Sequence, residues 1–471
     1  MSTTSQHRSK PHRGKGALRG ASPARLAALE VVRISRERDA FAQDVIAKHI
    51  DNSSMSREDR AFATLLVLGV VSSRGTLDEV LNRCMNSPKD VQDDVRDALQ
   101  ISTYEIIFLD KSPHAAVDQG VELVRSIAPK AAGLANAVLR KVVKAKDHFP
   151  FGDPRSDLGA YARLVAFPEW LVEKIVADLG AQAAHAYFKA SNEPAPVFIA
   201  INALKAHEQD SLLVLTAAKG APRAAGAGGL DVPGCYLLET GQILVDGRVS
   251  RMLNNGEILV SDAASQAVAM LVLPEEGSDV PASMLEIGAG RGTKTILLQS
   301  NALRRWGAQI GRYVTLDNHM FKTKLLQDRV KQYGVHVSEA LTGDATKLDE
   351  SLGDECFDLV FIDAPCTGLG TLRRHPEIRW RLKPETIRSY AGLGLEMLKS
   401  ASHHVKVGGH LAYATCTITD EEDVQVVKAF LQSEEGSHFQ LVPLAGRSSF
   451  ATNLVSGGSD AHFAVKMVKL D

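Results

Sequence analysis

MLEIGAGRGTK, residues 284–294, is the stretch of this 471-residue chain that indicates its fold most clearly. It joins a short apolar run, typical of a buried strand, to glycines that suit a tight turn into a helix. Similar apolar runs occur at 313–317 (YVTLD), 357–363 (FDLVFID) and 410–415 (HLAYAT), with helix-like segments between them. This alternation predicts an α/β domain over residues 256–471, in which helices cover both faces of a mainly parallel sheet.

A glycine-rich loop and three acids follow the predicted strands, at the edge of the sheet where ligands bind in such folds. Asp317 could accept hydrogen bonds from ribose hydroxyls, and Asp344 could meet an adenine amino group. Each acid alone is equally typical of a helix cap, and the loop alone of a plain turn, but together they favour a nucleoside. No phosphate-binding lysine or arginine stands at the usual place in the loop, so S-adenosylmethionine is expected rather than NAD or ATP. The predicted cofactor-binding residues are Gly288, Ala289, Gly290, Arg291, Gly292, Thr293, Lys294, Asp317, Asp344 and Asp363.

Two cysteines, Cys366 and Cys416, follow strand ends on the same side of the predicted sheet. A cysteine in that place is usually structural, but two of them beside Asp363 favour chemistry. A thiolate that adds to carbon 6 of cytosine turns carbon 5 into a nucleophile that can take a methyl group. Asp363 would stabilise charge at N3, the second thiol would assist release, and Lys294 would favour the thiolate. These four residues are the predicted catalytic set.

Composition limits the class of protein. The chain is 45% apolar and 23% charged and has a net charge of −2, so any surface for nucleic acid must be local. Five scattered cysteines without a CxxC pair predict free thiols in a reducing compartment and no metal site, with Cys84 and Cys356 as structural residues. Neither a signal peptide nor an apolar run of roughly 20 residues is seen, which predicts a cytoplasmic protein that does not span a membrane.

The remaining sequence predicts three further segments. Residues 1–21 form a basic tail, expected to be disordered, which is either simply solvated or attracts phosphates. Residues 22–146 have helical periodicity and little strand-like alternation, so they predict an all-helical domain. A linker rich in proline, glycine and charge separates them from residues 160–255, which predict a small α+β region.

The two cysteine motifs, DAPCTGLGTLRRHPEIRW (363–380) and LAYATCTI (411–418), resemble those of the RNA cytosine-C5 methyltransferases of the RsmB/Sun (NOP/NSUN) family. Segments 56–81, 114–125 and 133–142 resemble the NusB-like RNA-binding domain that one bacterial branch of this family carries. The resemblance extends over nearly the whole chain. It implies a NusB-like N-terminal domain, a small linking region and a Rossmann-like class I methyltransferase domain.

The resemblance also implies roles for individual residues. In this family the cysteine matching Cys416 is the nucleophile, and the one matching Cys366 aids product release. The implied cofactor is S-adenosylmethionine, and the implied partner is RNA, specifically 16S rRNA, with neither DNA nor a membrane; a monomer is expected. The family usually has AAPGGK after a cysteine, whereas this chain has GAGRGTK, in which Arg291 replaces the proline and Lys294 is kept.

Two other functions compete with this interpretation. The helical domain and the altered glycine loop are compatible with an RNA-binding, antitermination-like protein whose methyltransferase domain is inactive. Retention of both cysteines, Asp363 and Lys294 argues against that alternative, because a scaffold does not need two thiols at a ligand-binding edge. An amino or small-molecule methyltransferase is the second alternative, and DAPC in place of an NPPY-type motif argues against it.

Overall fold

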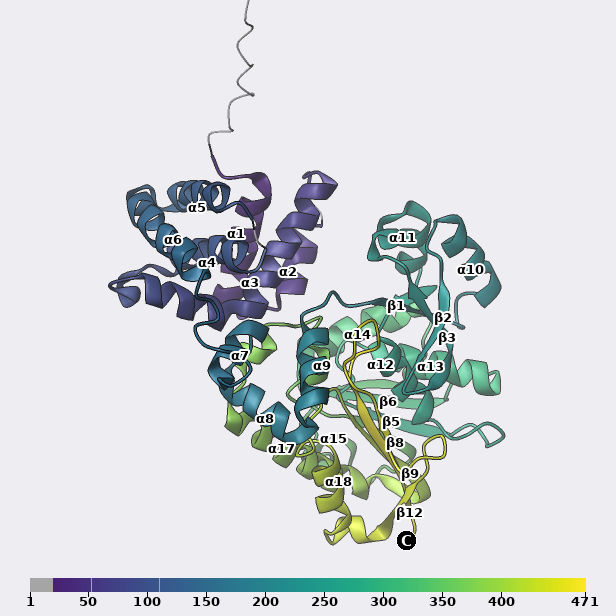
Figure 1. Cartoon of the computed structure of the whole chain (residues 1–471). Coiled ribbons are helices and arrows are strands. Elements are labelled where there is room, and N and C mark those ends of the chain that lie inside the picture. Colours follow the sequence, from purple (N-terminus) through teal and green to yellow (C-terminus); the bar gives the residue numbers. More distant parts are fainter. Residues whose placement is uncertain (1–19, 52, 110) are drawn as a thin grey trace, which may run out of the picture. The chain divides into compact units, whose positions relative to one another are not determined.

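A computed structural model of the chain describes residues 20–51, 53–109 and 111–471. Most of the predicted basic tail, residues 1–19, therefore lies outside the described residues. The chain forms two compact units, Met1–Ala160 and Tyr161–Asp471 (Figure 1).

The N-terminal unit is helical and is built around its longest helix, α3. Ser56 begins α3 because its side chain accepts the Asp59 N–H at 3.0 Å. Gly69 of α3 allows close packing against α4, since a β-carbon there would lie 1.9 Å from the Tyr104 ring. The helices of this unit are α1 (Pro23–Glu37), α2 (Ala42–His49), α3 (Arg57–Cys84), α4 (Asp93–Ile107), α5 (Pro113–Ile127) and α6 (Ala132–Lys146), and α7 (Leu158–Val165) follows.

Helix α3 is also the one described helix that is long and apolar enough to cross a membrane, judged by length and composition alone. Half of its most apolar window is buried inside the protein. Leu66, Val70 and Leu77 of this helix are completely buried in the hydrophobic core of the unit. The helix is therefore a core element of the N-terminal unit, and its apolar composition is explained by that packing.

The second unit begins with helices that precede a small antiparallel sheet. The sheet has the strand order β2-β3-β1-β4, and its core contains Ile199, Leu215 and Ile258. Mixed helices and strands in this region agree with the α+β prediction. The elements are α8 (Glu169–Leu179), α9 (Ala181–Ser191), β1 (Val197–Ile201), α10 (Glu208–Ala217), β2 (Arg223–Ala227), β3 (Leu230–Leu238), α11 (Gly247–Asn254) and β4 (Ile258–Val260).

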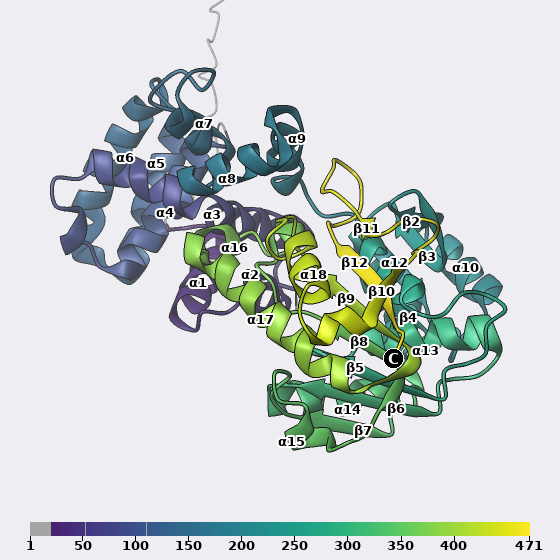
Figure 2. The ribbon, with the colours of Figure 1, turned by 90° about the horizontal axis from the view of Figure 1, so that it is seen from below.

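A larger sheet forms the rest of the unit, with the strand order β10-β12-β9-β8-β5-β6-β7 and with β11 paired to β12 (Figure 2). The five strands from β9 to β7 pair in parallel, and β12 and β10 are antiparallel. The prediction of a mainly parallel sheet is confirmed. The strands are β5 (Ser283–Ile287), β6 (Arg312–Asp317), β7 (Glu339–Thr342), β8 (Phe357–Asp363), β9 (Val405–Thr415), β10 (Phe439–Val442), β11 (Phe450–Ala451) and β12 (Phe463–Lys469).

Helices cover both faces of this sheet, as the alternating sequence predicts. Buried side chains of α12, α13 and α14 pack on one face, and those of α17 and α18 pack on the other. Each face therefore has its own apolar core, which fixes the register of the strands and the positions of the loops at their ends. The helices are α12 (Ala263–Leu271), α13 (Thr293–Trp306), α14 (Met320–Tyr333), α15 (Asp349–Leu352), α16 (Ile378–Arg381), α17 (Pro384–His403) and α18 (Val424–Leu431).

Candidate active site

Along the chain, β6 and β7 follow on one side of β5, and β8 and β9 then follow on its other side. The strand order therefore reverses between β5 and β8, which are neighbours in the sheet. Ligands of open α/β sheets bind at such a switch point, beyond the carboxyl ends of the strands. Gly288 follows β5 here with φ of 78°, and a β-carbon on it would lie 2.3 Å from the carbonyl oxygen of Asp363. Only glycine fits this approach, so the first glycine of the loop is required by the packing of two strand ends.

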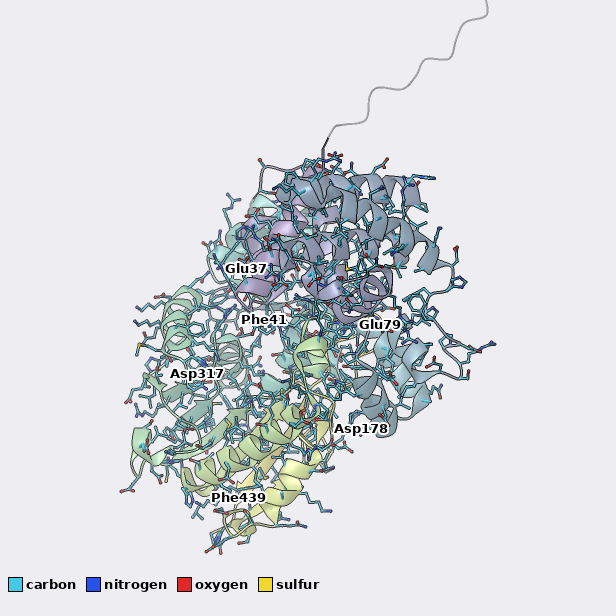
Figure 3. All side chains as sticks on the ribbon, turned by 90° about the vertical axis from the view of Figure 1, so that its left-hand side faces the viewer. Glu37, Phe41, Glu79, Asp178, Asp317 and Phe439 are labelled. Carbon is cyan, nitrogen blue, oxygen red and sulfur yellow. The ribbon has the colours of Figure 1, made fainter. Side chains whose placement is uncertain are left out.

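The glycine loop is held by the end of β6. The Gly290 N–H donates to Asp317 Oδ2 at 3.0 Å, and the Gly288 N–H donates to the Leu316 carbonyl at 2.8 Å. Asp317 is 6% exposed, its Oδ1 accepts the His319 N–H at 3.0 Å, and Lys322 Nζ lies 3.4 Å away (Figure 3). The structure thus brings together the predicted loop and the predicted ribose-binding acid.

The other predicted loop residues differ in exposure. Ala289 and Gly292 are buried, Arg291 is exposed, and Thr293 begins α13. Arg329 donates to the Arg291 carbonyl at 2.8 Å and to the Thr293 hydroxyl at 3.2 Å, which ties the loop to α14. Three glycines of the loop have positive φ, a backbone conformation that residues with a side chain rarely adopt.

Asp344 differs from Asp317 in its surroundings. Its side chain is exposed, and its Oδ1 accepts the Thr346 N–H at 2.9 Å and the Thr346 hydroxyl at 2.8 Å. The backbone and side-chain hydrogen bonds from Thr346 lower the pKa of Asp344. These bonds are those of a residue that caps its own turn, and no hydrogen bond joins Asp344 to the other predicted acids within the described residues.

Lys294 and Asp363 form the charged centre of the site. Lys294 Nζ lies 2.9 Å from Asp363 Oδ1 and 2.8 Å from Oδ2, and 11% of the lysine side chain is exposed. Burial acts to lower the pKa of Lys294, but the carboxylate of Asp363 and the charges of Cys416 and Glu286 outweigh it and raise that pKa. The lysine is therefore an ammonium ion beside both Asp363 and the second cysteine.

Glu286 lies beneath the glycine loop at the end of β5 and is completely buried. Burial raises its pKa to about 7, partly offset by Thr295 and by the Tyr313 hydroxyl, which donates to Glu286 Oε2 at 2.8 Å. Glu286 is not among the predicted cofactor-binding or catalytic residues, although it lies two positions before the first glycine of the loop.

The two predicted cysteines are in contact. Cys366 Sγ and Cys416 Sγ lie 3.3 Å apart, and the Cys416 N–H also donates to Cys366 Sγ at 3.3 Å. The hydrogen bond with Cys416, burial, and the charges of Cys416 and Glu422 raise the pKa of Cys366 well above its ordinary value. The raised pKa keeps Cys366 in its thiol form. Both cysteines are free and half-buried.

The loop that carries Cys366 is fixed from two sides. The Gly370 N–H donates to the Cys416 carbonyl at 2.9 Å, and the Ala461 N–H donates to the Gly370 carbonyl at 3.0 Å. The Tyr187 hydroxyl of α9 donates to the Leu369 carbonyl at 2.7 Å. The Cys366 loop is thereby attached both to the Cys416 loop and to the helices at the start of this unit.

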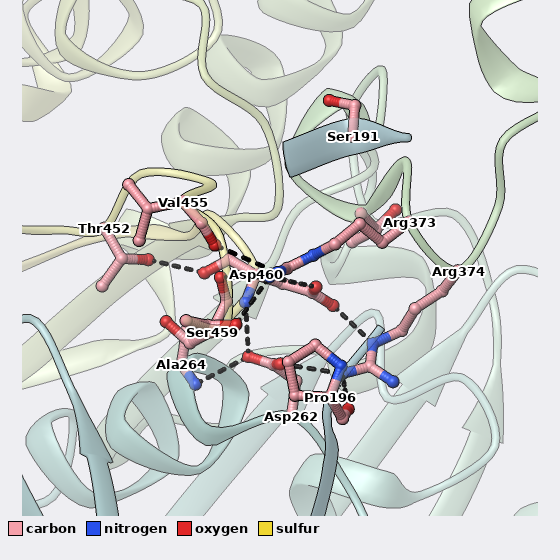
Figure 4. A network of polar contacts seen from close by, with 12 residues as sticks. Ser191, Pro196, Asp262, Ala264, Arg373, Arg374, Thr452, Val455, Ser459 and Asp460 are labelled. Atoms are coloured by element: carbon pink, nitrogen blue, oxygen red, sulfur yellow. Dashed lines mark hydrogen bonds and ion pairs between the residues drawn. The ribbon is translucent and has the colours of Figure 1, made fainter. Parts of the chain in front are cut away.

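Four charged side chains also hold the Cys366 loop in place (Figure 4). Arg374 lies 2.7 Å from Asp460 and 2.9 Å from Asp262, and Arg373 donates to the carbonyls of Gly458 and Ser459. Burial raises the pKa of Asp460 to about 6 despite both arginines. The network ties the RR pair after the Cys366 motif to the start of α12 and to the loop before β12.

His462 and Glu422 are two further residues near the sulfurs that the sequence prediction missed. Phe463 pairs with Thr415, the residue before Cys416, and His462 is the residue before Phe463. Burial and the charges of Lys294 and Arg374 push the pKa of His462 well below its ordinary value, so its imidazole is neutral. Glu422 is buried between the two cysteine loops. Neither residue belongs to a sequence pattern that predicts its place.

Models of three protein families match parts of the chain. The NusB family matches residues 22–144, a ferredoxin-like domain of RsmF/B-like methyltransferases matches residues 167–227, and 16S rRNA methyltransferase RsmB/F matches residues 269–456. The predicted fold class is confirmed: a NusB-like helical domain, an α+β region and a Rossmann-like methyltransferase domain in that order.

Solved structures agree on the fold. The crystal structure of PH0851 has a TM-score of 0.77 and 24% identity, over 95% of this chain and 99% of that one. The structure of NSun6 from Pyrococcus horikoshii with SFG has a TM-score of 0.52 and 18% identity, over 65% of this chain and 100% of that one. At these identities the likeness concerns the fold alone.

Relatives of known sequence cover most of the chain. A protein of Mycobacterium tuberculosis named as a methyltransferase is 31% identical over 85% of this chain and 84% of its own length. A Bacillus subtilis protein named as ribosomal RNA small subunit methyltransferase B is 29% identical over 86% and 87%. The corresponding Escherichia coli protein is 28% identical over 80% and 83%. The chain belongs to the RsmB/F family of methyltransferases, whose methyl donor is S-adenosylmethionine, as the sequence predicted.

Proposed function

We propose that this chain methylates carbon 5 of cytosine in ribosomal RNA, with 16S rRNA as the substrate, through a covalent adduct between Cys416 and carbon 6. The observation that carries the proposal is the pair of cysteine sulfurs, 3.3 Å apart, next to the Lys294–Asp363 ion pair. Relatives named as small subunit rRNA methyltransferases support the choice of substrate.

The glycine loop and Asp317 are the residues that would hold S-adenosylmethionine. Bound there, the cofactor supplies an electrophilic methyl group on sulfur. A β-carbon on Gly290 would meet only the Gly288 carbonyl oxygen, at 3.8 Å, so the backbone there leaves room for a ligand, and Asp317 offers a buried carboxylate beside it. Asp344 would contribute less, because its carboxylate already bonds its own turn.

Cys416 is the proposed nucleophile because Lys294 is the cation next to it. A neighbouring ammonium group favours a thiolate over a thiol, whereas the raised pKa of Cys366 keeps that sulfur protonated. Attack forms a bond from Cys416 Sγ to carbon 6, and the electrons of the ring double bond move toward carbon 5 and N3. A proton shared within the Lys294–Asp363 pair would stabilise the charge at N3.

Release requires the reverse of the first step. By then carbon 5 has bonded to the methyl group, and the bond from that methyl group to the cofactor sulfur has broken. Carbon 5 passes its proton to solvent water, the ring double bond forms again, and the bond between carbon 6 and Cys416 Sγ breaks. Cys366 is the proposed assistant in this step, because its thiol lies in contact with Cys416 Sγ and can donate to the departing sulfur. The target base must leave its stack to reach these residues.

The N-terminal unit is the proposed RNA-binding part. Its match to the NusB family supports this, as do Arg140, Lys141 and Lys144, which are exposed on α6. Lysine and arginine that contact phosphates make binding strongly dependent on salt. The described N-terminal unit has no counterpart of the two cysteines and the ion pair, so the chemistry is assigned to the second unit.

Bisulfite sequencing of rRNA and tRNA from cells with and without this protein tests the proposal. We expect a protected cytosine in 16S rRNA that disappears when the protein is absent and returns with the wild-type chain, and not with Cys416→Ala. A lost signal in tRNA alone would contradict the substrate. Unchanged signals in all RNA would contradict the cytosine assignment.

A further inference from the structure

Glu422 is a buried carboxylate that receives hydrogen bonds from the residues following both cysteines. Its Oε1 accepts the Thr367 N–H at 2.6 Å, and its Oε2 accepts the Thr367 hydroxyl at 2.7 Å. Oε2 also accepts the hydroxyls of Thr417 at 3.0 Å and Thr419 at 2.6 Å. Thr367 and Thr417 are the immediate neighbours of Cys366 and Cys416, so one side chain links both loops at one residue from each sulfur.

The surroundings of Glu422 are those of a functional charge. It is 1% exposed, and within the described residues no lysine or arginine forms an ion pair with it. Burying a carboxylate without a cation is costly unless several donors compensate, and here one N–H and three hydroxyls do so. A purely structural link between two loops could be made by apolar packing at lower cost. The charge is therefore better explained by an effect on the cysteines.

We propose that Glu422 is a positioning residue that ties the Cys366 loop to the Cys416 loop and, through its negative charge, keeps Cys366 in the thiol form. This inference rests on the proposed function for its role in catalysis, but its geometric part concerns the free protein alone. The consequence is a division of labour: one sulfur is free to become the nucleophile, while its neighbour keeps the proton needed for release.

Several titratable side chains surround Glu422 and Cys366. The charge of Glu422 contributes to the raised pKa of Cys366, and burial raises the pKa of Glu422 itself. Asp423 next to it has a pKa raised to about 8 by burial and is largely protonated near neutral pH. Tyr413, Cys416 and Asp420 interact electrostatically with Glu422, Asp423 or Cys366, and Lys294 interacts with Cys416.

The geometric test uses Glu422→Gln in the full chain, with Glu421→Gln as the matched control. Glu421 is the neighbouring acid, and it pairs with Lys174 at 2.8 Å instead of with the cysteine loops. The readout is the rate at which dibromobimane links Cys366 to Cys416 in the RNA-free protein, divided by the rate at which iodoacetamide alkylates Cys366 at the same pH, so that a change in protonation cancels. The linked peptides are identified by mass spectrometry. Because glutamine places an N–H group among hydrogen-bond donors and loosens the two loops, we expect this ratio to fall roughly tenfold or more, and the control to match wild type.

The electrostatic test is the pH dependence of Cys366 alkylation by iodoacetamide. We expect the midpoint to move to lower pH in Glu422→Gln, which a merely structural role would not produce. We also expect kcat for methylation to fall without a change in the Kd of S-adenosylmethionine. Wild-type linking and an unmoved midpoint in folded Glu422→Gln would overturn the inference, whereas absence of methylation by the wild-type protein would overturn only the proposed function.

A second variant keeps the test decisive if Glu422→Gln does not fold. Thr367→Val removes one hydroxyl donor to Glu422 and leaves the backbone bond in place. Thr371→Val is its control, because Thr371 is in the same loop and its hydroxyl bonds the Gly368 carbonyl instead. Slower linking in Thr367→Val alone would support the inference, and equal linking rates in the two variants would contradict it.

Discussion

The two halves of the site are built in different ways. At the ends of β5 and β6 the glycine loop is held by hydrogen bonds to the Leu316 carbonyl and the Asp317 side chain, and Asp344 after β7 is exposed to solvent. At the ends of β8 and β9 the two cysteine loops are held by buried carboxylates, Glu422 on one side and Asp460, bonded to Arg374, on the other. The difference indicates that cofactor binding tolerates altered sequence, whereas the two sulfurs require a fixed geometry.

The largest effect expected at the cysteine half is that of Cys416→Ala. Removing a nucleophile that forms a covalent intermediate should lower kcat by roughly 10⁴-fold or more. The Kd of S-adenosylmethionine should stay at the wild-type value, because the thiol belongs to the other half of the site. Methyl transfer to RNA from labelled cofactor measures the first quantity, and calorimetry measures the second. Substantial activity in this variant would remove Cys416 from the mechanism.

Asp363→Asn tests the ion pair that joins the two halves. It leaves Lys294 largely buried without a counter-charge, and it removes the carboxylate assigned to N3. We expect kcat to fall by roughly 10²–10³-fold, as when one stabilising group for developing charge is lost. We also expect about 2 kcal/mol of lost stability, below the range for fully buried pairs because 27% of the Asp363 side chain is exposed. Denaturant unfolding checks the stability, and a fall in stability without any fall in kcat would confine the pair to a structural role.

Glu286→Gln probes the buried acid beneath the loop through pH. The folded pKa of about 7 lies above the ordinary value of 4.5, so ionisation of Glu286 opposes folding as pH rises through that window. The wild-type chain should therefore lose up to about 3 kcal/mol relative to Glu286→Gln between pH 4.5 and 8. Thermal unfolding of both chains at pH 5 and pH 8 measures this difference. The exposed Glu350→Gln should show none, and a pH-independent difference for Glu286→Gln would contradict the assigned burial effect.

The smallest effects distinguish the two acids of the cofactor half. Asp317→Ala should weaken S-adenosylmethionine binding by roughly 1–3 kcal/mol, because a buried carboxylate that accepts charged or multiple hydrogen bonds is lost. Asp344→Ala should weaken it less, since Asp344 is exposed and bonds Thr346. Calorimetry on the two variants gives the order. If Asp344→Ala weakened binding more than Asp317→Ala, burial of the acid would not determine how much it contributes to cofactor binding.

Local sequence was enough to predict much of the fold and several side chains at the ends of the strands. Alternating apolar runs predicted the parallel sheet, and the residues directly after those runs predicted the neighbourhood of Asp317, Asp363 and the cysteines. These features depend on strand ends, which a parallel sheet places at one edge. The structure brings the two sulfurs into contact and pairs Lys294 with Asp363, while the roles of these residues stay predictions.

The features that sequence could not predict depend on packing between distant segments. Glu422 lies in the acidic run DEED, which is typical of an exposed helix start, yet it bonds Thr367, 55 residues earlier. His462 comes close to the Cys416 loop through the antiparallel pairing of β12 with β9, which no local pattern specifies. Asp344 follows a predicted strand like Asp317, but the turn that it caps holds its carboxylate outside. Burial of a polar side chain is decided by such long-range contacts and not by its neighbours in sequence.

Trapping of a protein–RNA adduct is the most direct test of the covalent mechanism. Cys366→Ala should still attack and methylate the base and then fail to release it, so a complex with substrate RNA should survive denaturing electrophoresis. Cys416→Ala and the double variant should form none. An adduct with Cys416→Ala instead would reverse the roles of the two sulfurs, and full methylation by both single variants without any adduct would contradict the covalent mechanism.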